Sequence, residues 1–363
     1  MGPLKGIKIL EFAGIGPGPF CGMLLADLGA EVIKISRPDS KGNGSKYDLN
    51  DRSKFSITLD LKNDESINEL KKLIGQVDAV FEGFRPGVME KLGLGPNDLL
   101  SINEKLVYGR MTGWGQEGVF SDMAGHDLNY LSITGALNAI GRKDERPPVP
   151  LNLIADYGGG GMLLAVGMLS ALIHSQKTGK GQVVDAAMID GTSMLMSLFY
   201  SFYGSGVWAN ERESNLLDGA AHFYDTYECK DGKYIAVACI EDKFYKEMLD
   251  KLEITDEKFS KQFSKDIWPE LKSKLGEKFL SKNRDEWAMI FKNSDACITP
   301  ILDLDEAPKH EHNKSRSTFT ERDGVVQPNP SPRFSETPLE IKSSPKKIGE
   351  DNILISEKYN INL

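Results

Sequence analysis

The feature that most constrains this fold is an alternation of short apolar segments and helix-patterned segments along the first 190 residues. Residues 7–13 predict a strand, residues 20–28 place apolar side chains at helical spacing, and residues 31–36 predict a second strand. The alternation continues with expected strands over 55–61, 79–84, 106–112 and 183–188 and expected helices over 64–74, 88–92, 162–174 and 191–203. Repeated strand–helix–strand units predict an α/β fold whose large domain is doubly wound and Rossmann-like.

The pattern changes after residue 205. Residues 224–229 and 234–240 predict a β-hairpin, since Asp231-Gly232 suits a tight turn, and helices are expected over 243–251, 268–280 and 285–292. We therefore expect the large domain over 1–190 and a smaller α+β domain over 221–300. Linkers are expected over 191–220 and 301–324, and the segment from about 325 to 363 is expected to return to the large domain.

Composition excludes several classes of protein. A formal net charge of −9 leaves no basic surplus for nucleic acid. The four cysteines form no C-x-x-C pair, and His310 and His312 lack further ligands nearby, so no metal is expected. No apolar stretch approaches the ~18 residues of a membrane span. The chain enters a strand directly after its first residues and does not end in S-K-L, so we expect a cytoplasmic protein without a membrane partner.

The loop after the first expected strand suggests a phosphorylated ligand. Gly14–Pro19 occupies the place of a dinucleotide phosphate loop, but Pro19 stands where the third glycine of G-x-G-x-x-G belongs. Arg37 replaces the acid that would hold a ribose diol, which favours a phosphorylated ribose such as that of NADP or coenzyme A over NAD. Lys62 and Arg85 follow two further strands, where ligands of open α/β sheets bind.

Two groups beside glycines could carry acid–base chemistry. His126 follows Gly125, and Asp156 shortly precedes Gly158–Gly161. If the imidazole and the carboxylate converge on one carbon from opposite faces, one can remove a proton and the other can return it with inversion. Structural interpretations remain open: Asp156 could cap a helix, and the glycines could admit a ligand to a helix N-terminus or permit tight packing.

The motifs resemble those of family III CoA-transferases over nearly the whole chain, to about residue 335. Within that family the resemblance is strongest to members that racemise α-methylacyl-CoA thioesters. The matching segments are Leu10–Phe20, Phe84-Arg85-Pro86-Gly87, Gly113-Trp114-Gly115-Gln116, Gly125-His126-Asp127, Leu151-Asn152-Leu153 and Gly179–Ala186.

The resemblance implies an enzyme that racemises 2-methylacyl-CoA thioesters at C2 by 1,1-proton transfer through an enolate. It implies that His126 acts on the S face, that Asp156 acts on the R face, and that the Asp127 backbone N–H stabilises the enolate oxygen. It also implies that Glu241 orients His126 from the partner subunit of an interlocked homodimer, with no cofactor beyond the CoA of the substrate. The implied contacts to substrate and CoA are Arg37, Thr58, Leu59, Asp60, Leu61, Lys62, Gly83, Arg85, Ala124, Gly125, Asn129 and Tyr130.

Other functions remain open at this stage. A family III transferase would use Asp156 as the nucleophile that moves CoA between carboxylic acids, whereas His126 as a second base favours racemisation. A non-catalytic acyl-CoA binder and an NADP oxidoreductase are further alternatives. Glu241 and Asp127 could also serve as helix caps, and His222 is interpreted as structural unless it points into the site.

Overall fold

The computed structural model describes residues 2–40 and 44–363, which divide into two compact units. The first unit contains the residues up to 134, 150–196 and 311–363. The second contains 135–149 and 197–310. Residues 135–149, which the sequence places in the large domain, therefore cluster with the second unit. Each unit has its own hydrophobic core.

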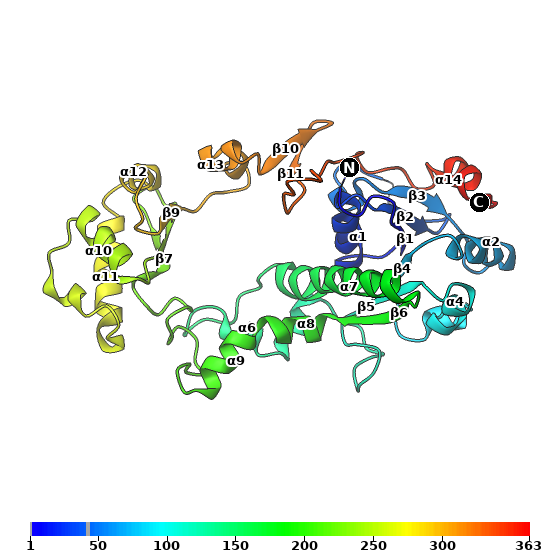
Figure 1. The fold of residues 1–363 in the computed structure, drawn as a ribbon. Coiled ribbons are helices and arrows are strands. Elements are labelled where there is room, and N and C mark those ends of the chain that lie inside the picture. The colour runs from blue at the N-terminus through cyan, green and yellow to red at the C-terminus, as the bar shows by residue number, and fades with distance from the viewer. Residues whose placement is uncertain (1, 41–43) are drawn as a thin grey trace. The chain divides into compact units, whose positions relative to one another are not determined.

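A six-stranded parallel sheet forms the centre of the first unit (Figure 1). The strand order is β3-β2-β1-β4-β5-β6, and each neighbouring pair runs parallel. This arrangement confirms the expected α/β class with a parallel sheet. The strands are β1 (Lys8–Phe12), β2 (Glu31–Ser36), β3 (Phe55–Thr58), β4 (Ala79–Glu82), β5 (Val107–Thr112) and β6 (Gln182–Ala187).

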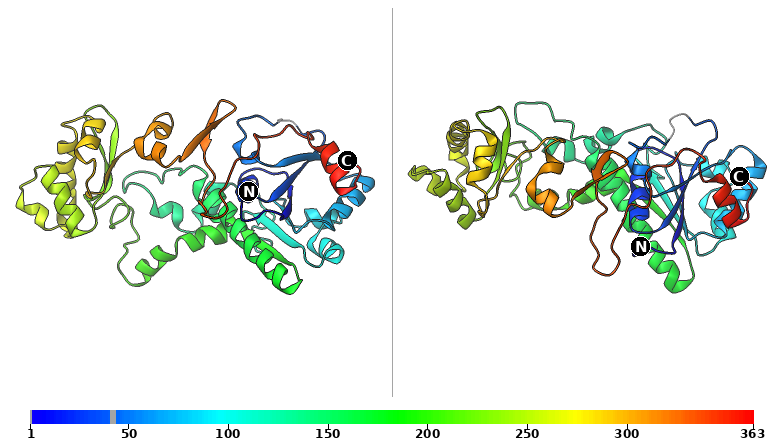
Figure 2. Two further views of the ribbon diagram at one scale, coloured as in Figure 1. Left: turned by 45° about the horizontal axis from the view of Figure 1, so that its top comes forward. Right: turned by 90° about the horizontal axis from the view of Figure 1, so that it is seen from above.

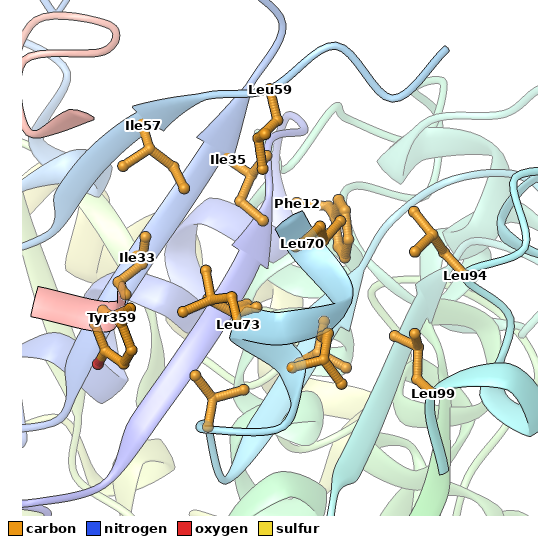
Figure 3. Close-up of a cluster of buried hydrophobic side chains, with 14 of the residues drawn as sticks. Phe12, Ile33, Ile35, Ile57, Leu59, Leu70, Leu73, Leu94, Leu99 and Tyr359 are labelled. Carbon is orange, nitrogen blue, oxygen red and sulfur yellow. The ribbon is translucent and has the colours of Figure 1, made fainter. Parts of the chain in front are cut away.

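Helices connect these strands, as crossover connections in a parallel sheet require. The apolar side chains of α2 pack with those of β1–β4 in one buried cluster, shown in Figure 3. Up to residue 196, the helices of this unit are α1 (Pro17–Asp27), α2 (Asp64–Ile74), α3 (Val88–Lys91), α4 (Pro96–Ile102), α5 (Asp127–Ser132), α7 (Leu163–Thr178) and α8 (Met188–Leu195).

The C-terminal segment belongs to the first unit. It forms α13 (Glu311–Ser315), a hairpin of β10 (Phe319–Arg322) and β11 (Val325–Pro328), and α14 (Asn352–Tyr359). Both views in Figure 2 show α14 beside the edge strand β3, and its Ile355 and Tyr359 enter the buried cluster of Figure 3.

The long apolar helix begins earlier than the sequence suggests. A π-helical segment, η2 (Leu153–Met162), runs directly into α7, so Asp156 lies inside the helix and the interpretation of Asp156 as its N-cap is wrong. The continuous helix Leu153–Thr178 is long and apolar enough to cross a membrane by length and composition, which corrects the expectation that no such stretch exists. Half of its most apolar window is buried inside the protein.

The glycines of η2 serve helix packing. A Cβ on Gly159 would lie 2.7 Å from the Thr192 nitrogen of α8, and one on Gly161 would lie 2.8 Å from the Pro17 oxygen of α1. Such distances are shorter than atoms can tolerate, so a side chain at either position would force the helices apart. The alternative that these glycines permit tight packing is confirmed at both positions.

The second unit combines an antiparallel sheet with helices. Its sheet has the order β7-β8-β9, built from β7 (Tyr224–Glu228), β8 (Tyr234–Ala238) and β9 (Ile298–Pro300), and the expected hairpin is present. Its core contains His222, which is fully buried and lies 2.7 Å from the Tyr245 hydroxyl through Nε2. The helices are α6 (Ala136–Ala139), α9 (Ser197–Gly204), α10 (Asp242–Lys251), α11 (Trp268–Phe279) and α12 (Arg284–Ile290).

Candidate active site

A cavity of about 710 Å³ opens where the strand order of the sheet reverses. The chain leaves β1 toward β2 and leaves β4 toward β5, so the loops after these adjacent strands diverge, which is where open α/β sheets bind ligands. The cavity is lined by residues 12–19 from the end of β1 onward, 83–86 after β4 and 111–114 from the end of β5 onward. The whole Gly14–Pro19 turn identified in the sequence therefore forms one wall.

His126 enters the cavity from the start of α5. It is the N-cap residue of this helix, with φ −134° and ψ 173°, and it is exposed. Its backbone N–H donates to Asn129 Oδ1 at 3.1 Å, which fixes the residue against the first helical turn. The imidazole is thus presented from a short loop that a helix start holds in place.

Asp156 enters the same cavity from η2 and is half-buried. The Asn152 side-chain amide approaches its Oδ2 at 3.4 Å, one helical turn away. Burial raises the pKa of Asp156, and the nearby charge of Asp127 acts in the same direction, whereas Asn152 and His126 oppose the rise. A rise in this direction makes the carboxyl a better proton donor for general acid–base chemistry than an ordinary, fully ionised aspartate.

The Asp127 side chain links the two segments. Its Oδ2 accepts the backbone N–H groups of Ala155 and Asp156, each at 2.8 Å. The interpretation of Asp127 as a cap is confirmed, although the helix that its carboxylate caps is η2 and not its own.

Aromatic side chains close another part of the wall. Trp114 and Tyr130 meet edge to face with ring centroids 4.8 Å apart, and both line the cavity. Burial, with the charge of Asp156, raises the pKa of Tyr130 to about 12, so its hydroxyl stays protonated near neutral pH. Trp114 and Asn152 also line the cavity, although the sequence pattern does not mark either of them as a site residue. The four-residue spacing from Asn152 to Asp156 could have indicated that the two side chains are neighbours, because side chains at i and i+4 lie on the same face of a helix.

Seven of the residues selected from the sequence meet in this cavity. They are His126 and Asp156 together with Gly83, Arg85, Ala124, Gly125 and Tyr130. Arg85 is exposed and brings a positive charge to the loop after β4. The cavity thus combines a cation, an imidazole and a carboxyl.

Other selected residues lie outside the lining of this cavity. Leu59 and Leu61 pack in or against the core cluster, and Thr58 exchanges hydrogen bonds with Asn352. Asp60 Oδ1 accepts the Lys62 N–H, and Lys62 and Arg37 are exposed after their strands. Contacts of these residues and of Asn129 with CoA stay predictions.

Glu241 belongs to the second unit, where it is the N-cap residue of α10 without a side-chain capping hydrogen bond. Its expected role beside His126 stays a prediction. Within residues 2–40 and 44–363, no three His, Cys, Asp or Glu side chains are grouped so that they could hold a metal ion.

Comparison with known proteins places the chain in a family. A sequence profile described as CoA-transferase family III matches residues 4–352. Alpha-methylacyl-CoA racemases from Mus musculus and Homo sapiens are each 43% identical to this chain, over 98% of it and 93% of their own length. The crystal structure of a CAIB/BAIF family protein from Brucella suis matches with a TM-score of 0.85 at 27% identity, covering 99% of both chains. The chain therefore belongs to CoA-transferase family III.

Proposed function

We propose that this protein racemises 2-methylacyl-CoA thioesters at C2. The observation that carries the proposal is the opening of His126 and Asp156, from two different helices, into one cavity at the switch point of the sheet. The identity to mammalian racemases over nearly the whole chain supports it.

The reaction needs two groups in opposite protonation states. The α-proton of a thioester is acidic because its removal gives an enolate, and one group takes this proton while the other supplies a proton from the far face. From the 2S epimer His126 is the base and Asp156 the acid, and from the 2R epimer the roles exchange. The Asp127 N–H is the proposed donor to the enolate oxygen, since the first N–H groups of a helix have no partner within it. Glu241 is proposed to orient His126.

The second candidate is CoA transfer, which the family itself supports. Here the Asp156 carboxylate would attack the thioester carbonyl, the C–S bond would break to release the CoA thiolate, and Asp156 would carry the acyl group as a mixed anhydride until the acceptor acid takes its place and CoA is returned. Proton NMR separates the two functions. A 2-methylacyl-CoA of single configuration is incubated with the enzyme in D₂O without any acceptor acid. Racemisation collapses the methyl doublet to a singlet as deuterium enters C2, whereas an intact doublet would favour transfer.

We also propose that the protein works as a homodimer with interlocked subunits. Large apolar side chains are exposed on both units, and exposed apolar surface of this kind typically marks an interface. On the first unit they include Val166, Ile173 and Met194, and on the second Leu198, Tyr200 and Tyr203. Light scattering coupled to size-exclusion chromatography tests this: a mass near twice 40.1 kDa is expected, and a monomer would contradict the proposal.

A further inference from the structure

We propose that Asp127 is a positioning residue whose buried carboxylate holds His126 and Asp156 in register across the cavity. The inference rests on the proposed racemase function and assigns the Asp127 side chain a task separate from that of its backbone N–H. The Asp127 carboxylate is buried and its Oδ2 faces the backbone of Ala155 and Asp156, so the side chain acts through the residues that it holds.

The geometry is that of a bridge between two helix starts. Asp127 is the first residue of α5 and follows His126 directly in the chain. Its Oδ2 accepts the N–H groups of Ala155 and Asp156 at 2.8 Å each, across 28 and 29 residues of sequence. A displacement of α5 relative to η2 would break these hydrogen bonds, so the backbone of His126 is held to the backbone of Asp156.

Burial makes this bridge strong. Asp127 is only 6% exposed, and a buried carboxylate needs hydrogen bonds to replace its lost water. The two N–H groups belong to the first turn of η2, where partial positive charge accumulates, and hydrogen bonds to an ionised acceptor are stronger than neutral ones. Within the described residues Oδ1 is buried without a hydrogen-bond partner, so the charge is held chiefly through Oδ2.

The same carboxylate also changes the electrostatics of the reacting acid. The charged or polar groups that face Asp156 are Asp127, His126, Tyr130 and Asn152. Of these, Asp127 adds to the effect of burial in raising the pKa of Asp156. Removal of its charge is therefore expected to lower the pKa of Asp156.

Three variants of the full-length protein test the inference. Asp127→Asn keeps a carbonyl acceptor but removes the charge, and Asp127→Ala removes both. Asp351→Asn is the matched control, because Asp351 is a buried carboxylate of the same unit that accepts the Ser56 N–H at 2.9 Å and does not line the cavity. The rate of deuterium entry at C2 of a (2R)-2-methylacyl-CoA is measured against pH, together with amide exchange of the peptide covering 152–162.

Asp127→Ala is expected to lose amide protection in 152–162 and to lower kcat about 10- to 100-fold with little change in KM. Asp127→Asn is expected to keep most of the amide protection that Asp127→Ala loses. It is also expected to move the acid limb of the rate profile to lower pH, since Asp156 is the base for this epimer and its pKa falls when the Asp127 charge is removed. Asp351→Asn is expected to change neither quantity.

Wild-type kcat and protection in Asp127→Ala would overturn the inference, and so would an unmoved acid limb in Asp127→Asn. If the wild-type protein itself exchanges no α-proton, the racemase function fails. The amide exchange of Asp127→Ala then decides by itself whether Asp127 holds the Asp156 segment.

Discussion

At the residue scale, Gly16 sets how closely the loop after β1 approaches the carboxyl of Asp156. Its φ is +70°, and a Cβ built on it would lie 3.0 Å from Asp156 Oδ2. Gly16→Ala is therefore expected to lower kcat at least about tenfold. The substitution strains the backbone by about 1–2 kcal/mol, and the new Cβ would displace the Asp156 carboxyl by steric contact. Gly179→Ala is the control, since Gly179 has φ +75° at the end of α7 and lies outside the cavity. Equal loss of activity in both variants would contradict this account.

His222 gives the second unit a dependence on pH. Burial lowers the pKa of His222 from 6.5 to about 4. As the pH falls, the unfolded chain therefore binds the proton before the folded chain does. Titration of His222 leaves the free energy of unfolding unchanged above about pH 6.5 and decreases it as the pH falls from about 6.5 to about 4. The loss amounts to roughly 3 kcal/mol.

Urea unfolding at several pH values tests this prediction. His222→Gln can still bond the Tyr245 hydroxyl but does not titrate, so its stability should change less between pH 7 and 4 than that of the wild type. Parallel curves for the two proteins would show that another group causes the acid sensitivity.

Some of the residues that line the cavity could be predicted from the sequence and others could not. His126 and Asp156 could be selected because His126 follows Gly125 and Asp156 shortly precedes Gly158–Gly161, and both line the cavity. Trp114 was not selected, since an aromatic residue in a loop gives no sign of which wall it joins until β5 fixes its position. Leu59 was selected by resemblance, yet its side chain is buried in the core.

At the element scale, Arg110 of β5 holds the loop that carries Arg85. Its guanidinium pairs with Glu82 at 3.2 Å, before the loop, and with Glu90 at 2.8 Å, after it. Glu82 also accepts the Phe84 N–H at 2.7 Å, and burial raises the pKa of Glu82 to about 7. Arg110 therefore fixes both ends of one wall of the cavity.

Arg110→Gln is expected to cost about 3 kcal/mol of stability, because it leaves Glu82 buried without its cation. It should also raise KM for acyl-CoA several-fold with a smaller effect on kcat, since the loop and not the reacting groups is loosened. Glu90→Gln removes only the exposed partner and should have a weaker effect on both quantities. An unchanged KM in Arg110→Gln would contradict the proposed role in holding the loop.

Elements were predictable where the local signal is strong. The bounds of β2 and α2 match the expected 31–36 and 64–74, since alternation marks the strand and Asn63 caps the helix through its side chain. The sequence does not predict that the helix begins at Leu153, because four consecutive glycines usually indicate a loop. Here the glycines are helical and allow η2 to pack closely against α1 and α8. The expected helix 191–203 is two helices, α8 and α9.

At the scale of the whole molecule, the fold explains why distant segments share one site. The two candidate bases lie 30 residues apart in the sequence, and the reversal of strand order gathers the loops of β1, β4 and β5 around them. Local periodicity predicts the strands but not their order, which depends on non-local pairing. The sequence pattern by itself could therefore supply the class of fold but not the walls of the cavity.

If His126 and Asp156 act on opposite faces of one carbon, removing either base separates proton exchange from inversion at that carbon. Deuterium entry and inversion at C2 are measured from each epimer of a 2-methylacyl-CoA with His126→Ala and Asp156→Ala. Neither variant is expected to invert the centre. His126→Ala is expected to exchange deuterium only into the 2R epimer, and Asp156→Ala only into the 2S epimer. Inversion at near wild-type rate in either variant would contradict the two-base mechanism.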